Sequence, residues 1–162
     1  MKHLTLFSLF ISLVFFSNLE GSPIPAAHLT LGGGYNQAGC HHSGGVFQAE
    51  YLFYRRYFRL IRPQVAIVSP ELRSLFIGGG LGVELYLSRH LIFIPSFFPG
   101  LYIRGSGKDL GCPLEFRSTL GFAYEWGWGF RLSFQYSHFS NGSISHKNPG
   151  LNTAILSLGF PL

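Results

Sequence analysis

The sequence predicts an all-β fold, an eight-stranded antiparallel transmembrane β-barrel of the outer-membrane type. Three observations lead to this: a short apolar leader, strand-length segments in which apolar residues alternate with small or polar ones, and no later apolar stretch long enough for a spanning helix. The 162 residues are 47% apolar and 12% charged, and they include 21 glycines. This length allows one domain, and the composition is too apolar for a disordered chain.

The first segment has the pattern of a secretory signal peptide. Lys2 precedes an uncharged run from Leu4 to Phe16, and small residues follow. The run is shorter than the roughly 20 apolar residues of a spanning helix. We therefore expect residues 1–22 to be removed, with cleavage between residues 21 and 27, and residues 23–162 to form a single barrel domain.

The formal charge of +5 is compatible with two kinds of partner, nucleic acid or an anionic lipid head group. Export argues against nucleic acid, so we expect the lipid. Export also exposes Cys40 and Cys112 to an oxidising compartment, where a disulfide is possible but not established by two scattered cysteines. His41-His42 has no further ligands nearby in the sequence, so we expect a polar loop, with no metal and no cofactor.

Eight strand-length segments follow the leader, separated by short clusters rich in Gly, Asn, Ser, Arg or Pro. They cover His28–Tyr35, Gly44–Tyr54, Phe58–Val68, Leu75–Leu87, Leu91–Ile103, Leu114–Trp126, Trp128–Asn141 and Leu151–Leu162.

The first four segments differ in how clearly they alternate. Gly32–Gly34 in the first fits the crowded interior of a small barrel and lacks the strand-to-helix context of a nucleotide loop. Gln48 and Glu50 in the second share one face, opposite apolar neighbours. In the third segment the alternation of apolar and polar residues breaks near Arg62 and Pro63, so we expect a bulge at Pro63. In the fourth, an apolar face opposes Gly78, Gly80, Gly82 and Glu84.

The last four segments complete the predicted wall. The fifth is almost wholly apolar and defines no face. The sixth and seventh have inner faces of polar or small residues, namely Glu115, Arg117, Thr119, Gly121 and Ala123, then Arg131, Ser133, Gln135 and Ser137. The eighth places Asn152, Ala154, Leu156, Leu158 and Phe160 on one face.

A soluble lipocalin-like barrel or a sandwich would show similar alternation with the apolar face inward. Aromatic residues at segment ends favour the membrane, because they form the interfacial girdles of outer-membrane barrels. They are Tyr51, Phe53, Tyr54, Tyr57, Phe58, Tyr124, Trp126 and Trp128.

An eight-stranded barrel with both ends in the periplasm has its odd-numbered connections outside. The connection 142–150 is then external. This places His138, Ser140 and Asn152 at the outer rim, in phase with the lipid-facing side, where unpaired polar groups are costly. Their convergence fits a nucleophile and a base, although a lone His-x-Ser pair is commonly an ordinary interfacial feature.

Three motifs resemble the lipid A 3-O-deacylase (PagL) family, a group of acyloxyacyl hydrolase-like outer-membrane proteins. They are Leu114-Glu115-Phe116-Arg117-Ser118, His138-Phe139-Ser140-Asn141-Gly142 and Asn148-Pro149-Gly150-Leu151-Asn152. The resemblance covers roughly the last 60 residues by motif. It implies an outer-membrane esterase that removes the 3-position acyl chain of lipid A in lipopolysaccharide.

By this resemblance Ser140 is the nucleophile, His138 the general base and Asn141 an oxyanion donor. The family pattern has a Glu where this chain has Asn152, and an Asn can orient a histidine without stabilising imidazolium by charge. Glu115 is the nearest carboxylate in the motifs, but its parity turns it inward, where we expect it to pair with Arg117.

Arg104, Lys108 and Lys147 lie near predicted external connections, so we expect them to attract lipid A phosphates, although solvated loop charges are the alternative. Two further functions stay open. One is a non-catalytic barrel with an adhesive or membrane-stabilising role, and the other is an acyltransferase with the same nucleophile. The sequence leaves open a homodimer, the acyl length and the position cleaved.

Overall fold

The computed structural model describes residues 26–37, 44–71 and 73–162. The predicted leader, Cys40 and the His41-His42 pair lie outside the described residues, so the signal peptide and the Cys40–Cys112 disulfide stay expectations. Within the described ranges, no helix is long and apolar enough to span a membrane.

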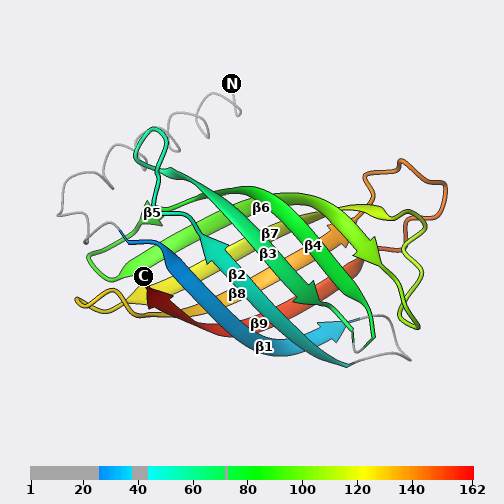
Figure 1. Ribbon diagram of the computed structural model, residues 1–162, viewed down its shortest axis with the longest axis horizontal. Coiled ribbons are helices and arrows are strands. Elements are labelled where there is room, and N and C mark those ends of the chain that lie inside the picture. Colours follow the sequence, from blue (N-terminus) through cyan, green and yellow to red (C-terminus); the bar gives the residue numbers. More distant parts are fainter. Residues whose placement is uncertain (1–25, 38–43, 72) are drawn as a thin grey trace, which may run out of the picture.

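The described chain forms one closed antiparallel sheet (Figure 1). Its strands are β1 (His28–Gln37), β2 (Gly45–Leu52), β3 (Ile61–Ser69), β4 (Leu75–Val83), β5 (Leu85–Tyr86), β6 (Leu91–Ile103), β7 (Leu114–Glu125), β8 (Arg131–Ser140) and β9 (Leu151–Pro161). β4 and β5 pair with β6 in one register, so they are one strand interrupted at Glu84. Because β1 pairs with β2 and β9, and β4 with β3 and β6, the sheet closes and the predicted eight-stranded barrel is confirmed.

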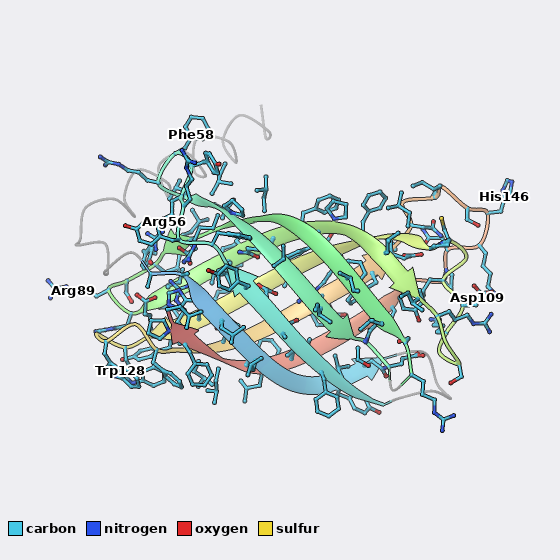
Figure 2. All side chains as sticks on the ribbon, viewed as in Figure 1. Arg56, Phe58, Arg89, Asp109, Trp128 and His146 are labelled. Atoms are coloured by element: carbon cyan, nitrogen blue, oxygen red, sulfur yellow. The ribbon has the colours of Figure 1, made fainter. Side chains whose placement is uncertain are left out.

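The two ends of the barrel differ. The C-terminus and the start of β1 lie at one end, and the connections 104–113 and 141–150 lie at the other (Figure 1). Asp109 and His146 accordingly lie at the end opposite Arg56, Arg89 and Trp128 (Figure 2). When both chain ends of a barrel lie in the periplasm, the opposite end faces outward, so Asp109 and His146 lie at the external end.

The predicted faces are confirmed in β2, β4, β7 and β8, where polar or small residues are buried inside and apolar ones are exposed on the wall. The bulge expected at Pro63 was wrong. Pro63 pairs with Leu81 in an uninterrupted register, and Arg62 shares the buried inner face with Gln64. The predicted segment began at Phe58, whereas β3 begins at Ile61, and from Ile61 onward inward and outward positions alternate without a break.

Two networks of charged side chains and one cluster of apolar side chains fill the interior of the barrel. Arg117 contacts Glu50 at 3.2 Å and Gln48 at 2.6 Å. Glu84 contacts Arg131 at 2.6 Å and Arg62 at 2.9 Å. The apolar cluster consists of Val46, Ala66, Val68, Phe76, Phe98, Tyr102, Leu110, Phe139, Leu151 and Ile155.

The expected pairing of Glu115 with Arg117 was wrong. Glu115 is buried as predicted, but neither of its carboxylate oxygens has a hydrogen-bond partner among the described residues. Two side chains on one strand face run side by side, whereas the narrow barrel brings Glu50 of β2 directly onto the Arg117 guanidinium.

A closed sheet leaves no strand edge to fray, so we expect the purified protein to be heat-modifiable. Unheated and boiled samples should migrate differently in SDS gels, because the unheated barrel stays folded. Recovery of the correctly exported protein in the soluble periplasmic fraction would contradict membrane insertion.

Candidate active site

His138 and Asn152 are direct cross-strand partners on the outer wall. β8 and β9 pair them in register, and His138 is exposed to the lipid side. His138 Nδ1 lies 2.6 Å from Asn152 Oδ1. Because an amide oxygen can only accept, Nδ1 carries the hydrogen and Nε2 becomes the proton-accepting nitrogen. The arrangement therefore selects the tautomer that a general base needs.

Ser140 ends β8 on the same face, two residues beyond His138. It is half-buried and pairs across the sheet with Phe116. Two residues along a strand separate the Cα atoms by about 6.5–7 Å. Within the described ranges no hydrogen bond joins Ser140 Oγ to His138, and catalytic contacts of this kind commonly tighten only when substrate binds.

Ser118 is a neighbour of His138 to which the sequence motif assigned no position in the site. It is exposed on β7 and lies directly opposite His138. Ser118, His138 and Asn152 thus form one polar row across three neighbouring strands of an otherwise apolar wall. The sequence contains a sign of this position, because Ser118 is a polar residue among the outward apolar residues Leu114, Phe116 and Leu120.

Asn141 holds the two outer loops together. Its side-chain Nδ2 donates to Leu110 O and to Lys147 O, each at 2.9 Å, and its Oδ1 accepts from Ser143 N at 3.1 Å. The residue is fully buried. Both amide hydrogens are committed to carbonyls, so oxyanion donation by this side chain would require the loops to separate.

Gly150 and Lys108 support the imidazole from the loops. Gly150 has a φ of +59°, and a Cβ there would lie 2.8 Å from His138 Cε1. Lys108 Nζ donates to Gly150 O at 2.8 Å. The Lys108 backbone is itself held, because its N–H donates to Glu71 Oε2 and its carbonyl accepts from the Tyr102 hydroxyl.

Lys108→Met should lower kcat about tenfold with little change in KM, because the Gly150 carbonyl loses its donor and the imidazole loses its support. Lys108→Arg, which keeps a donor, should restore part of the loss. Steady-state kinetics of both variants are the measurement. An effect confined to KM would instead assign Lys108 to substrate binding.

The other two predicted cations meet at one carboxylate. Lys147 Nζ lies 2.7 Å and Arg104 Nη1 3.6 Å from Asp109 Oδ2. The hydrogen bond from Lys147, together with that from the Gly111 N–H, lowers the pKa of Asp109 below its usual value. Asp109 therefore stays ionised beside Lys147 and Arg104 at neutral pH, and the three side chains together keep a net positive charge.

The described residues thus present a serine, a tautomer-selected histidine and a cationic rim on a lipid-facing wall. They contain no group of three His, Cys, Asp or Glu side chains that could hold a metal ion. A family model for lipid A 3-O-deacylase (PagL) matches residues 64–161, more than half of the chain. The chain belongs to the PagL family. It therefore carries the barrel domain of a lipid A deacylase family, and the matched range includes His138, Ser140 and Asn152.

Solved structures resemble this PagL-family chain in fold. The crystal structure of the outer-membrane enzyme PagL has a TM-score of 0.63 at 13% identity and covers 83% of this chain and 99% of its own. A de novo designed transmembrane β-barrel has a TM-score of 0.62 at 12% identity, covering 89% and 100%. The Yersinia pestis outer-membrane protein Ail in a nanodisc reaches 0.53 at 8% identity, covering 86% and 100%. No curated protein has a significantly similar sequence.

Proposed function

We propose that this chain is an outer-membrane esterase that removes the ester-linked acyl chain at the 3 position of lipid A by a Ser-His mechanism. The observation that carries the proposal is the 2.6 Å hydrogen bond between His138 and Asn152 on the lipid-facing wall, two residues from Ser140. Membership of the PagL family supports lipid A as the substrate.

In this mechanism His138 Nε2 takes the Ser140 proton while Oγ attacks the ester carbonyl. The tetrahedral intermediate collapses to an acyl-serine, and His138 returns the proton to the sugar oxygen that leaves. Water, activated by the same nitrogen, then releases the fatty acid and regenerates Ser140.

Asn152 is the orienting residue in this proposal. It fixes the Nδ1–H tautomer but supplies no charge to the imidazolium. Glu115 cannot supply that charge from its place inside the barrel. Asn141 acts as a positioning residue that fixes the loops beside the nucleophile, in place of the oxyanion role inferred from the motif.

Arg104 and Lys147 are proposed to attract the phosphates of lipid A. The double variant Arg104→Gln, Lys147→Gln should raise KM several-fold at low salt, and the difference should shrink at high salt. Asp109→Asn breaks the same ion pairs but makes the cluster more positive, so it should lower KM. If all these changes raise KM alike, the ion pairs hold the loops and do not recruit substrate.

The proposal is tested by mass spectrometry of lipid A from cells with and without the protein. We expect loss of one ester-linked chain and release of a free fatty acid. Appearance of that chain on another lipid would indicate an acyltransferase. Unchanged lipid A from cells with the folded barrel in the membrane would contradict the esterase proposal and favour the adhesive or membrane-stabilising role. The short outer connections among the described residues argue against that role.

A further inference from the structure

The connection between β2 and β3 ends in a short hairpin of its own. Tyr57 N donates to Ile61 O at 2.8 Å, and Ile61 N donates to Tyr57 O at 2.9 Å, so residues 58–60 form its tip. In Figure 1 this connection, drawn in teal, stands out from the side of the barrel at the end that holds the C-terminus. With both chain ends in the periplasm, it lies where the barrel meets the periplasmic leaflet of the membrane.

The tip of this hairpin is strained and presents a phenylalanine to the outside. Phe58 and Arg59 have φ angles of +49° and +63°, a region that bulky side chains rarely occupy. Phe58 is 88% exposed, the highest value among the large apolar side chains of the described residues, and Figure 2 places it outside the barrel wall. Backbone strain of this kind is often found at binding sites. The strained tip is therefore suited to contact a partner.

Two arginines of the hairpin carry their charge on its surface. Arg55 and Arg59 are both exposed, and the Arg55 guanidinium lies over the Tyr57 ring, 5.6 Å from its centroid. Arg56 differs, because its Nη2 lies 3.0 Å from Glu84 Oε2 inside the barrel. Arg56 therefore belongs to the interior network, whereas Arg55 and Arg59 present positive charge beside exposed aromatic rings.

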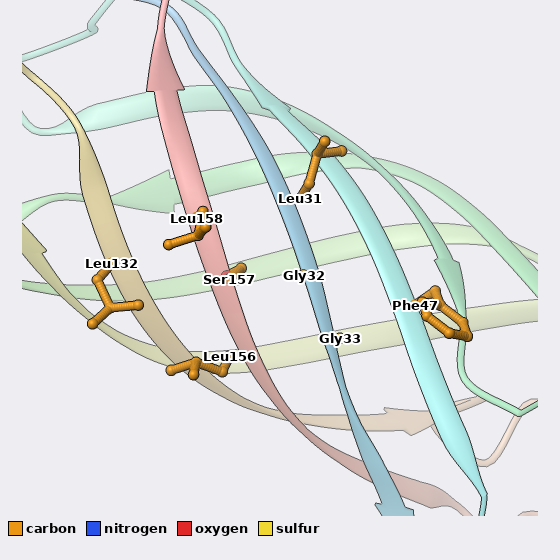
Figure 3. A pocket seen from close by; sticks show the side chains of 8 residues that line it. All are labelled: Leu31, Gly32, Gly33, Phe47, Leu132, Leu156, Ser157 and Leu158. Carbon is orange, nitrogen blue, oxygen red and sulfur yellow. The ribbon is translucent and has the colours of Figure 1, made fainter.

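The middle of the wall offers no comparable chemistry for recognising a lipid head group. Around β1 it presents hydrocarbon to the bilayer, and apolar side chains line a groove there (Figure 3). These side chains are Leu31, Phe47, Leu132, Leu156 and Leu158. At the periplasmic end, the carboxylates Glu84 and Glu125 are buried inside the barrel. No exposed carboxylate of the described residues at that end offsets Arg55 and Arg59.

We propose that residues 53–60, here called the arginine hairpin, bind anionic phospholipids of the periplasmic leaflet. Arg55 and Arg59 contact the lipid phosphate, and Phe58 enters the interface between head groups and hydrocarbon, where aromatic side chains are enriched. The occupant is a phospholipid, because the hairpin lies at the membrane surface and its charge is opposite to that of the head group. The inference is independent of the proposed esterase activity, which lies at the other end of the barrel.

The test measures the lipid selectivity of the full barrel reconstituted in phosphatidylcholine vesicles. Spin-labelled phosphatidylglycerol and spin-labelled phosphatidylcholine are added in trace amounts, and electron paramagnetic resonance gives the fraction of each that the protein immobilises. The ratio of the two association constants is compared in the original protein, in Arg55→Gln, Arg59→Gln and in Arg55→Lys, Arg59→Lys. The lysine variant is the matched control, because it changes the same positions and keeps their charge.

We expect the glutamine variant to lower this ratio about fivefold at low salt, which corresponds to losing about 1 kcal/mol of attraction to an anionic lipid. The lysine variant should keep most of the selectivity, and the difference between the two variants should shrink at high salt. An unchanged ratio in the glutamine variant would overturn the proposal. Equal losses in both variants would also overturn it, because they would assign the effect to the shape of the hairpin.

A second measurement locates the contact and separates lipid from free phosphate. Phosphatidylglycerol with a diazirine on its head group should label residues 53–60 in the original protein and label them much less in the glutamine variant. Excess inorganic phosphate, compared with chloride at the same ionic strength, should leave this labelling unchanged. Equal labelling of residues 53–60 in the two proteins, or its loss in inorganic phosphate, would contradict a phospholipid site.

Discussion

Ser140→Ala and His138→Ala are each expected to lower kcat/KM for lipid A deacylation by at least about a thousandfold, because they remove the nucleophile and its base. Both side chains face lipid and pack against no part of the interior core. The barrel should therefore stay heat-modifiable. The double variant should lose little more than either single variant, since the two residues act as one unit.

Ser118→Ala is the matched control for this prediction. It removes another serine of the outer wall that is also adjacent to His138. We expect its activity to stay within a few-fold of the original chain. A folded Ser140→Ala protein that still shortens lipid A, with Ser118→Ala inactive, would move the nucleophile to β7.

Asn152→Ala should lower kcat about a hundredfold, within the 10²–10⁴ range of general-base catalysis. Its loss releases Nδ1 and lets the imidazole adopt the unproductive tautomer. Asn152→Asp keeps an oxygen at the same place and adds a charge, so it should raise activity above that of the original chain. Asn152→Glu, the family residue, should act in the same direction.

The pH–rate profile separates orientation from charge at position 152. A carboxylate favours imidazolium, so the acidic limb of kcat/KM should move to higher pH in Asn152→Asp than in the original chain. Asn152→Ala activity equal to that of the original chain would show that the His138–Asn152 hydrogen bond has no catalytic part.

The fold was predictable because its signal is local. Period-two alternation in β2, β7 and β8 depends only on neighbouring residues, and the narrow interior accounts for the inner glycines. The same parity placed His138 and Asn152 on one wall, and hairpin register made them partners.

Contacts between distant segments were not predictable from one sequence. Lys108 reaches Gly150, and Asn141 reaches Leu110, only because the two outer loops fold over each other. Arg117 contacts Glu50 only because closure of the narrow barrel brings the inner faces of β7 and β2 together. Local patterns fix which face a residue occupies, but the partner it meets depends on closure of the sheet and on loop packing.

Ser140 as an acyl-carrying nucleophile is the central claim, and acid quenching during turnover tests it most directly. Intact mass followed by peptide mapping should find a fraction of the protein heavier by one acyl chain, with the modification on Ser140 and absent from the Ser140→Ala protein. An acyl group mapped to Ser118, or lipid A deacylation by a folded Ser140→Ala protein, would contradict it.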